Sequence, residues 1–266
     1  MKQLKRFYQL QKLVKPNQVL VIFGPRRVGK TTLLNQFLKK TNFKYRLDTG
    51  DDVVVQETLS SQNLKLIKEY AADYQLIAID EAQNIPNIGI ALKLMVDHIP
   101  NLRVVVTGSS TFELAGQVGE PLTGRKQTLI LYPLSQLELI KRYSPYDLKQ
   151  NLSDYLIFGS YPKILTLSTI QDKRQALEEI INSYLFKDIL SFEKVKNSKT
   201  LLNLLRLLAF QVGSQVSLTE LGNQLQLDYK TVARYLDLLE HLTHFFHQLL
   251  TDGLDLVWEE QIHLKN

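Results

Sequence analysis

The eight residues GPRRVGKT, at positions 24–31, determine how the rest of the chain is interpreted. They match the pattern G-x-x-x-x-G-K-[ST] at every fixed position. Glycines allow a turn tight enough for several backbone N–H groups to point at one anion, and the positive end of a following helix reinforces them. The pattern therefore predicts a phosphate-binding loop made of Gly24, Pro25, Arg26, Arg27, Val28, Gly29, Lys30 and Thr31.

Side chains of this loop have separable expected roles. Lys30 is expected to reach the β- and γ-phosphates of a nucleotide, and the Thr31 hydroxyl to ligate Mg²⁺. Thr32 is the next hydroxyl along the chain and a lesser candidate. Arg26 and Arg27 occupy variable positions, where we expect outward-facing, solvated positive charge.

The surroundings of the loop indicate a parallel α/β domain. The apolar run QVLVIF at 18–23 is typical of a strand buried on both faces, and the leucines and phenylalanine of 30–40 have helical spacing. Further strands alternate with helices, which predicts a three-layer domain over residues 1–135. The expected elements are an N-terminal helix from Leu4 to Leu13, strands at 43–48, 74–80, 102–108 and 127–132, and helices at 63–70 and 89–99.

A pair of carboxylates follows the third expected strand, in LIAIDEAQ (76–83). Asp80 is placed to orient Mg²⁺ and its waters. Glu81, one residue later, is placed to polarise an attacking water, which favours hydrolysis of the nucleotide in addition to binding.

Two further parts of the sequence, the end of the fourth strand and the start of the fifth, carry residues that could act near a γ-phosphate. The strand in VVVTGSS (104–110) ends in hydroxyls, of which Thr107 or Ser109, and less directly Ser110, could sense that phosphate; the alternative is a serine-rich turn that caps a helix. Arg125 precedes the fifth strand, where an arginine can reach a γ-phosphate in a neighbouring subunit; the alternative is a solvated side chain.

After residue 134 leucine-rich helical patterns replace the strands, with a charged break near 195–200. The segment 217–242 has the pattern of a helix-turn-helix, in which Ser217 and Glu220 resemble a capping box. Four residues near the start of the second helix are candidate contacts to double-stranded DNA: Tyr229, Lys230, Thr231 and Arg234. The alternative is a packing or oligomerisation module.

Composition narrows the class of protein. The absence of cysteine excludes disulfides, thiolate zinc sites and cysteine nucleophiles, and fits a reducing compartment. The N-terminus does not read as a secretory signal, and no apolar run reaches the ~18 residues of a membrane span. We therefore expect a cytoplasmic protein without a membrane partner.

These motifs, in this order, resemble the prokaryotic AAA-family ATPases, and in particular the archaeal and bacterial subset with a winged helix after the ATPase core. FGSYPKIL (158–165) resembles the Gly-x-x-Pro lid motif of that group. The resemblance implies ATP and Mg²⁺ as cofactors, possible homo-oligomers, a helical lid over 136–195 with Pro162 near the adenine or ribose, and a winged-helix domain over 200–250. It also implies a further, nuclease-like C-terminal domain of unknown function, of which 251–266 would be a truncated or irregular remnant.

The expected function is ATP hydrolysis that drives movement between the sheet domain and its lid. One alternative is a nucleotide-gated DNA-binding or signalling switch with little turnover, and another is a degenerate fragment that only binds nucleotide. A helicase of the DEAD-box type is disfavoured, because the helical patterns after 134 leave no room for its second α/β domain.

Overall fold

The computed structural model describes residues 6–109, 120–184, 198–211 and 215–236. The chain divides into two compact units, 1–184 and 185–266. The first unit contains both the sheet and the helices of the expected lid, so the predicted boundary at 135 lies inside it.

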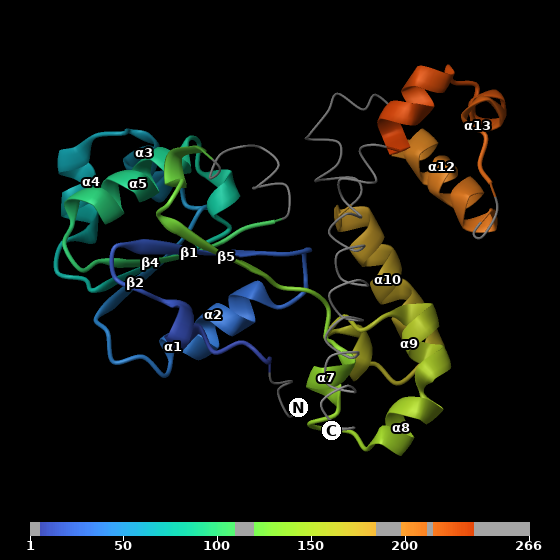
Figure 1. Ribbon diagram of the computed structural model, residues 1–266, viewed down its shortest axis with the longest axis horizontal. Coiled ribbons are helices and arrows are strands. Elements are labelled where there is room, and N and C mark those ends of the chain that lie inside the picture. The colour runs from blue at the N-terminus through green and yellow to red at the C-terminus, as the bar shows by residue number, and fades with distance from the viewer. Residues whose placement is uncertain (1–5, 110–119, 185–197, 212–214, 237–266) are drawn as a thin grey trace, which may run out of the picture. The chain divides into compact units, whose positions relative to one another are not determined.

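The first unit is built on a parallel five-stranded sheet, which confirms the predicted α/β class (Figure 1). Its strand order is β2-β3-β4-β1-β5, and every pairing is parallel. Thus β4 lies between β1 and β3, the two strands that precede the phosphate-loop pattern and the acidic pair. The strands are β1 (Gln18–Phe23), β2 (Tyr45–Thr49), β3 (Leu76–Asp80), β4 (Arg103–Thr107) and β5 (Lys126–Ile130).

Helices cover both faces of the sheet. α1 (Leu10–Leu13) and α2 (Lys30–Leu38) lie on one face, and α3 (Val53–Ser60), α4 (Leu64–Ala71) and α5 (Ile88–His98) on the other (Figure 1). Short 3₁₀ turns occur at Ala82–Asn84 and Glu120–Leu122. Residues 19–23 of β1 are at most 1% exposed, as predicted for a strand covered on both sides.

The N-terminal helix is much shorter than predicted. Residues 6–9 are not helical, and α1 has only four residues. The physical reason is a competing partner: the Phe7 backbone N–H donates to the carboxylate of Glu138, 131 residues away. Leu4 lies outside the described residues.

Helix α3 was not predicted, because its sequence VVVQETLS begins with three β-branched residues. The Asp52 side chain accepts hydrogen bonds from the N–H groups of Val54 and Val55 and so caps the helix. Val55 and Leu59 are buried. Capping and burial outweigh the weak helix propensity of valine here.

The helices after the sheet pack around a small core of their own. They are α7 (Gln136–Leu139), α8 (Pro145–Gln150), α9 (Leu152–Phe158), a 3₁₀ turn at Ile164–Thr166 and α10 (Ile170–Tyr184). Phe158, Ile164, Ala176 and Ile180 form the buried cluster. Ser135 and Ser144 start α7 and α8 with complete capping boxes.

In the second unit, α12 (Ser198–Phe210) and α13 (Leu218–Leu225) precede a helical stretch at 229–236. The turn before that stretch is tight: Leu227 N–H donates to the Gly222 carbonyl over 2.9 Å, and a Cβ on Gly222 would lie 2.7 Å from the Leu227 oxygen. The Ser217 hydroxyl accepts from Glu220 N–H, which is one of the two bonds of the predicted capping box.

This supports the helix-turn-helix pattern. The rest of the predicted winged helix, and the tail at 251–266, lie outside the described residues, so those assignments stay predictions. Within the described part of the chain, no helix is long and apolar enough to span a bilayer.

Candidate functional site

The loop 24–31 joins the carboxyl end of β1 to the first turn of α2. Its backbone uses three left-handed positions, Gly24 (φ 150°), Arg27 (φ 63°) and Gly29 (φ 101°). A Cβ on Gly24 would overlap the carbonyl oxygen of Leu131, which follows β5. Gly24 is therefore required both for its backbone conformation and for close packing against the sheet.

Lys30 is the buried cation of this loop, with 5% exposure. Its Nζ donates to the carbonyl oxygens of Gly24 (2.7 Å) and Pro25 (3.0 Å). The ammonium group is thus held inside the loop, at the N-terminus of α2, where an anion would be bound.

Asp80 lies beside Thr31, as the sequence predicts for groups at the carboxyl ends of parallel strands. The Thr31 hydroxyl donates to Asp80 Oδ2 over 2.8 Å, and the Thr107 hydroxyl donates to Asp80 Oδ1. A hydroxyl and a carboxylate next to a phosphate loop are the oxygen ligands that Mg²⁺ prefers, so these residues fit a Mg²⁺–nucleotide complex. Thr32 is exposed on the first turn of α2.

Glu81 adopts an unusual backbone conformation for a residue with a side chain (φ 51°). Its N–H donates to the Thr107 hydroxyl over 3.1 Å, and one carboxylate oxygen accepts from the Gln83 amide. The side-chain oxygen Oε1 of Gln83 in turn accepts from the Ser109 N–H over 3.2 Å. Gln83 therefore connects Glu81 to the end of the β4 segment.

Gln83 and Gly50 belong to this site but were not predicted as functional residues. Gly50 N–H donates to the Asp80 carbonyl over 2.7 Å, and a Cβ on Gly50 would overlap the Glu81 carbonyl oxygen. Two features of the sequence could have indicated them: the side-chain amide of Gln83 comes two residues after Glu81, and Gly50 directly follows the second strand.

The predicted phosphate sensors are buried. Thr107 is 0% and Ser109 1% exposed. The single hydroxyl hydrogen of Thr107 is used by Asp80, so Thr107 holds that carboxylate in place. Ser110 lies outside the described residues.

Arg27 is exposed, as expected for a variable position of the loop, and it also forms an ion pair. Its guanidinium lies 2.8 Å from the carboxylate of Glu179 on α10, and Lys163 Nζ lies 3.0 Å from the same oxygen. The hydrogen bonds from Lys163 and Arg27 lower the pKa of Glu179. Arg26 is half-buried.

Pro162 lies next to this ion-pair cluster, in the segment between α9 and the 3₁₀ turn at Ile164–Thr166. It is half-buried. Its neighbour Tyr161 packs against both the core under α2 and the core of the lid helices. The predicted lid residue thus lies between Tyr161, which contacts both cores, and Lys163, which belongs to the ion-pair cluster.

Arg125 lies at the amino-terminal ends of the strands, whereas loop 24–31 lies at their carboxyl ends. Its carbonyl accepts from Val19 N–H at the start of β1, whereas the loop follows the end of that strand. Its Nε donates to Asp97 Oδ1 on α5 over 2.5 Å, and this bond lowers the pKa of Asp97. Arg125 therefore does not reach the nucleotide site of its own chain.

The DNA-contact candidates differ in their accessibility. Tyr229 is 56% exposed, and Lys230 and Arg234 are also exposed. Thr231 is instead engaged in the cap of its helix: Asp228 is the N-cap residue, and its carboxylate accepts from the Thr231 N–H and hydroxyl over 2.9 and 2.6 Å.

Residues 16–140 match a family model described as an AAA domain, and residues 149–249 match a domain of unknown function (DUF8612). The first match supports a P-loop ATPase domain around the site described above. The second begins near the end of α8 and extends over α9, α10 and the helix-turn-helix pattern.

Curated relatives of the chain are themselves uncharacterized. A protein of Methanocaldococcus jannaschii is 25% identical over 79% of this chain and 51% of its own length. A protein of Haemophilus influenzae is 27% identical over 86% of this chain and 61% of its own length. A protein of Mycobacterium tuberculosis is 29% identical over 83% of this chain and 47% of its own length. The chain thus spans about half to three-fifths of the length of these relatives.

A solved structure is also similar to this chain. It is a signal transduction ATPase with numerous domains (STAND) protein with a tetratricopeptide repeat sensor, from Pyrococcus horikoshii. It is 18% identical and covers 74% of this chain and 37% of that one, with a TM-score of 0.39.

Proposed function

We propose that this chain binds ATP with Mg²⁺ at loop 24–31 and hydrolyses it, and that the nucleotide state controls the lid helices. The observation that carries the proposal is one assembly of groups at the carboxyl edge of the sheet. A buried Lys30 lies inside the loop, and the Thr31 hydroxyl lies 2.8 Å from the Asp80 carboxylate. The match of residues 16–140 to an AAA domain supports it.

In the proposed reaction most groups bind and orient. Lys30 and the loop N–H groups bind the phosphates, while Thr31 and Asp80 hold the Mg²⁺, which neutralises charge on the phosphate oxygens when bound. Glu81 accepts the proton of the attacking water as general base. Gln83 fixes the direction of that carboxylate through its amide hydrogen bond.

Coupling to the lid is proposed to run through Arg27 and Glu179. Arg27 belongs to the phosphate loop and Glu179 to α10, and Lys163 joins them beside Pro162. A phosphate anion near the loop would compete with Glu179 for Arg27. Binding and loss of the γ-phosphate would therefore change how firmly α10 is held.

Lys30→Ala tests nucleotide binding. Truncating one partner of a buried, hydrogen-bonded charge pair costs about 2–5 kcal/mol, which is roughly 30-fold to several thousand-fold in affinity. We expect a loss of this size in a titration with a fluorescent ATP analogue and Mg²⁺. Lys40→Ala, an exposed lysine after the same helix, is the matched control and should bind normally. Equal affinity of the Lys30→Ala variant and the parent would contradict the proposed site.

The second candidate function is a nucleotide-gated DNA-binding or signalling switch. It is favoured by the exposed Tyr229, Lys230 and Arg234 near the start of the helical stretch after a tight turn. DNA binding through these residues should weaken steeply with salt and in a Lys230→Ala/Arg234→Ala variant. Duplex titrations at two salt concentrations, with and without ATP, would reject this candidate if neither salt nor the substitutions change the affinity.

A further inference from the structure

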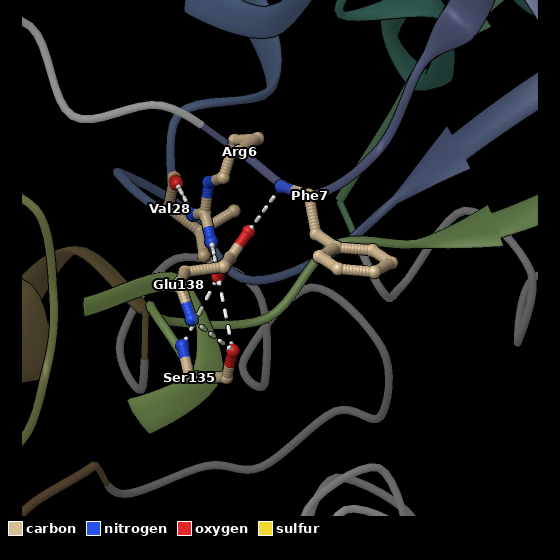
Figure 2. A network of polar contacts seen from close by, with 5 residues as sticks. All are labelled: Arg6, Phe7, Val28, Ser135 and Glu138. Carbon is tan, nitrogen blue, oxygen red and sulfur yellow. Dashed lines mark hydrogen bonds and ion pairs between the residues drawn. The ribbon is translucent and has the colours of Figure 1, made fainter. Parts of the chain in front are cut away.

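A buried ion pair lies next to the proposed site, between Arg6 and Glu138 (Figure 2). The two side chains are 7% and 4% exposed, and Arg6 Nη1 lies 3.1 Å from Glu138 Oε2. Burial lowers the pKa of Arg6, and the Glu138 carboxylate opposes that shift. A buried pair of this kind often contributes little net stability, so its position suggests another role.

Glu138 joins two distant segments of the chain. Its Oε1 accepts from Phe7 N–H over 2.8 Å, and its Oε2 accepts from Ser135 N–H over 3.0 Å (Figure 2). Glu138 is the third residue of α7, the first helix after the sheet. The carboxylate thereby fixes the N-terminal segment against the beginning of the lid helices.

The second contact of Arg6 is with the phosphate loop itself. Arg6 Nη2 donates to the carbonyl oxygen of Val28, inside loop 24–31 (Figure 2). The Val28–Gly29 peptide bond is trans, so the Val28 C=O and the Gly29 N–H point in opposite directions. When Arg6 holds the carbonyl, the Gly29 N–H is directed to the other side of the loop, away from the guanidinium.

We propose that Arg6 is a positioning residue of the nucleotide site: it fixes the Val28–Gly29 peptide so that the Gly29 N–H faces the phosphates. Glu138 makes this orientation depend on the start of α7. The inference rests on the proposed nucleotide site, but it does not require that ATP be hydrolysed.

Arginine suits this role better than lysine. The planar guanidinium presents separate N–H groups to the Glu138 carboxylate and the Val28 carbonyl at once, whereas a lysine ammonium is a point charge on a flexible stem. Arg6→Lys therefore keeps the charge but should not hold both partners.

The decisive variant is Arg6→Met/Glu138→Leu, which removes both charges and avoids leaving one of them buried alone. The chain should still fold, but with a lower unfolding temperature than the parent, because Glu138→Leu takes the acceptor away from the Phe7 and Ser135 N–H groups. We expect about a tenfold loss of affinity for MgATP, and a lower NMR order parameter for the Gly29 amide in the nucleotide-free protein, with Val21 in β1 unchanged. Arg6→Lys should show the same changes, although smaller.

Arg46→Met/Asp48→Leu is the matched control, because it removes an ion pair within β2 whose two side chains also bond to Tyr70 of α4, away from the loop and from α7. Equal losses of affinity in both double variants, or an unchanged Gly29 order parameter, would overturn the proposal. If the parent itself fails to bind MgATP, the proposed function fails. The Gly29 measurement then still decides whether Arg6 orders the peptide.

Discussion

Glu81 is the residue on which the proposed hydrolysis depends, and three neighbours set its position. Thr107 binds its N–H, Gln83 binds its carboxylate, and Gly50 leaves room for its carbonyl. A left-handed, non-glycine residue is costly and persists only when its surroundings fix it. The strained conformation of Glu81 is therefore consistent with a carboxylate held in one direction for chemistry.

Gln83→Ala tests this arrangement. Glu81 keeps its charge in the variant but loses the amide that orients it, so we expect kcat to fall about tenfold to a hundredfold with little change in nucleotide affinity. Steady-state phosphate release, together with an equilibrium titration, measures both quantities. Asn84→Ala is the control, because the Asn84 amide donates to Asp51 instead. An unchanged kcat in the Gln83→Ala variant would mean that Glu81 needs no such support.

The sequence predicted the proximity of Thr31 and Asp80 because both follow motifs with fixed positions at the carboxyl ends of strands. It did not predict Gln83 or Gly50. Their contacts depend on the left-handed turn at Glu81, and no local pattern in DEAQ indicates that turn. The contact between Arg6 and Val28 was missed for a related reason: it needs the tertiary packing of the N-terminal segment, which helical spacing alone does not reveal.

At the scale of elements, all five strands were predicted to within two residues at each end. For β1, β3 and β4 the reason is that buried parallel strands are near-continuous apolar runs, whereas β2 and β5 are more exposed. Helix α3 was missed because its valines favour strand locally, and the Asp52 cap and burial of Val55 decide its structure. The N-terminal helix was over-predicted because a distant acceptor takes the Phe7 N–H. Prediction from local sequence pattern is therefore correct where the apolar residues of the pattern are the buried ones. It fails where a helix cap or a hydrogen bond to a distant residue decides the structure.

The link between the phosphate loop and α10 gives a prediction for Glu179→Gln. The carboxylate serves two cations, so its loss should let α10 sample a wider range of positions, while the exposed site should leave the unfolding temperature unchanged. Because the chain has no cysteine, spin labels at Lys40→Cys and Gln175→Cys would report only the α2–α10 distance. We expect a broader distance distribution in the variant than in the parent.

Glu178→Gln, at an exposed neighbouring position, is the control for that measurement. Since the pKa of Glu179 is lowered, the link should persist as pH falls through the ordinary range of a glutamate and be lost only below it. Identical distributions in the parent and the Glu179→Gln variant would show that this ion pair does not restrain α10.

At the scale of the whole molecule, Arg125 is informative because it lies far from the nucleotide site of its own chain. If it acts on a γ-phosphate, it must do so in a neighbouring copy, and its bond to Asp97 must open. Lys30→Ala and Arg125→Ala chains should then each be inactive alone. A mixture should recover turnover, because Arg125 of the first chain completes the intact loop of the second. No recovery in a mixture that forms oligomers would exclude this role.

Hydrolysis of ATP, as distinct from binding alone, is tested most directly by steady-state phosphate release. The purified chain is measured with saturating MgATP and compared with Glu81→Gln at the same measured nucleotide occupancy. We predict Mg²⁺-dependent turnover by the parent and a fall of at least about a hundredfold in the variant, whose ATP affinity is preserved. Equal turnover by the two proteins, or none by the parent at full occupancy, would contradict this prediction.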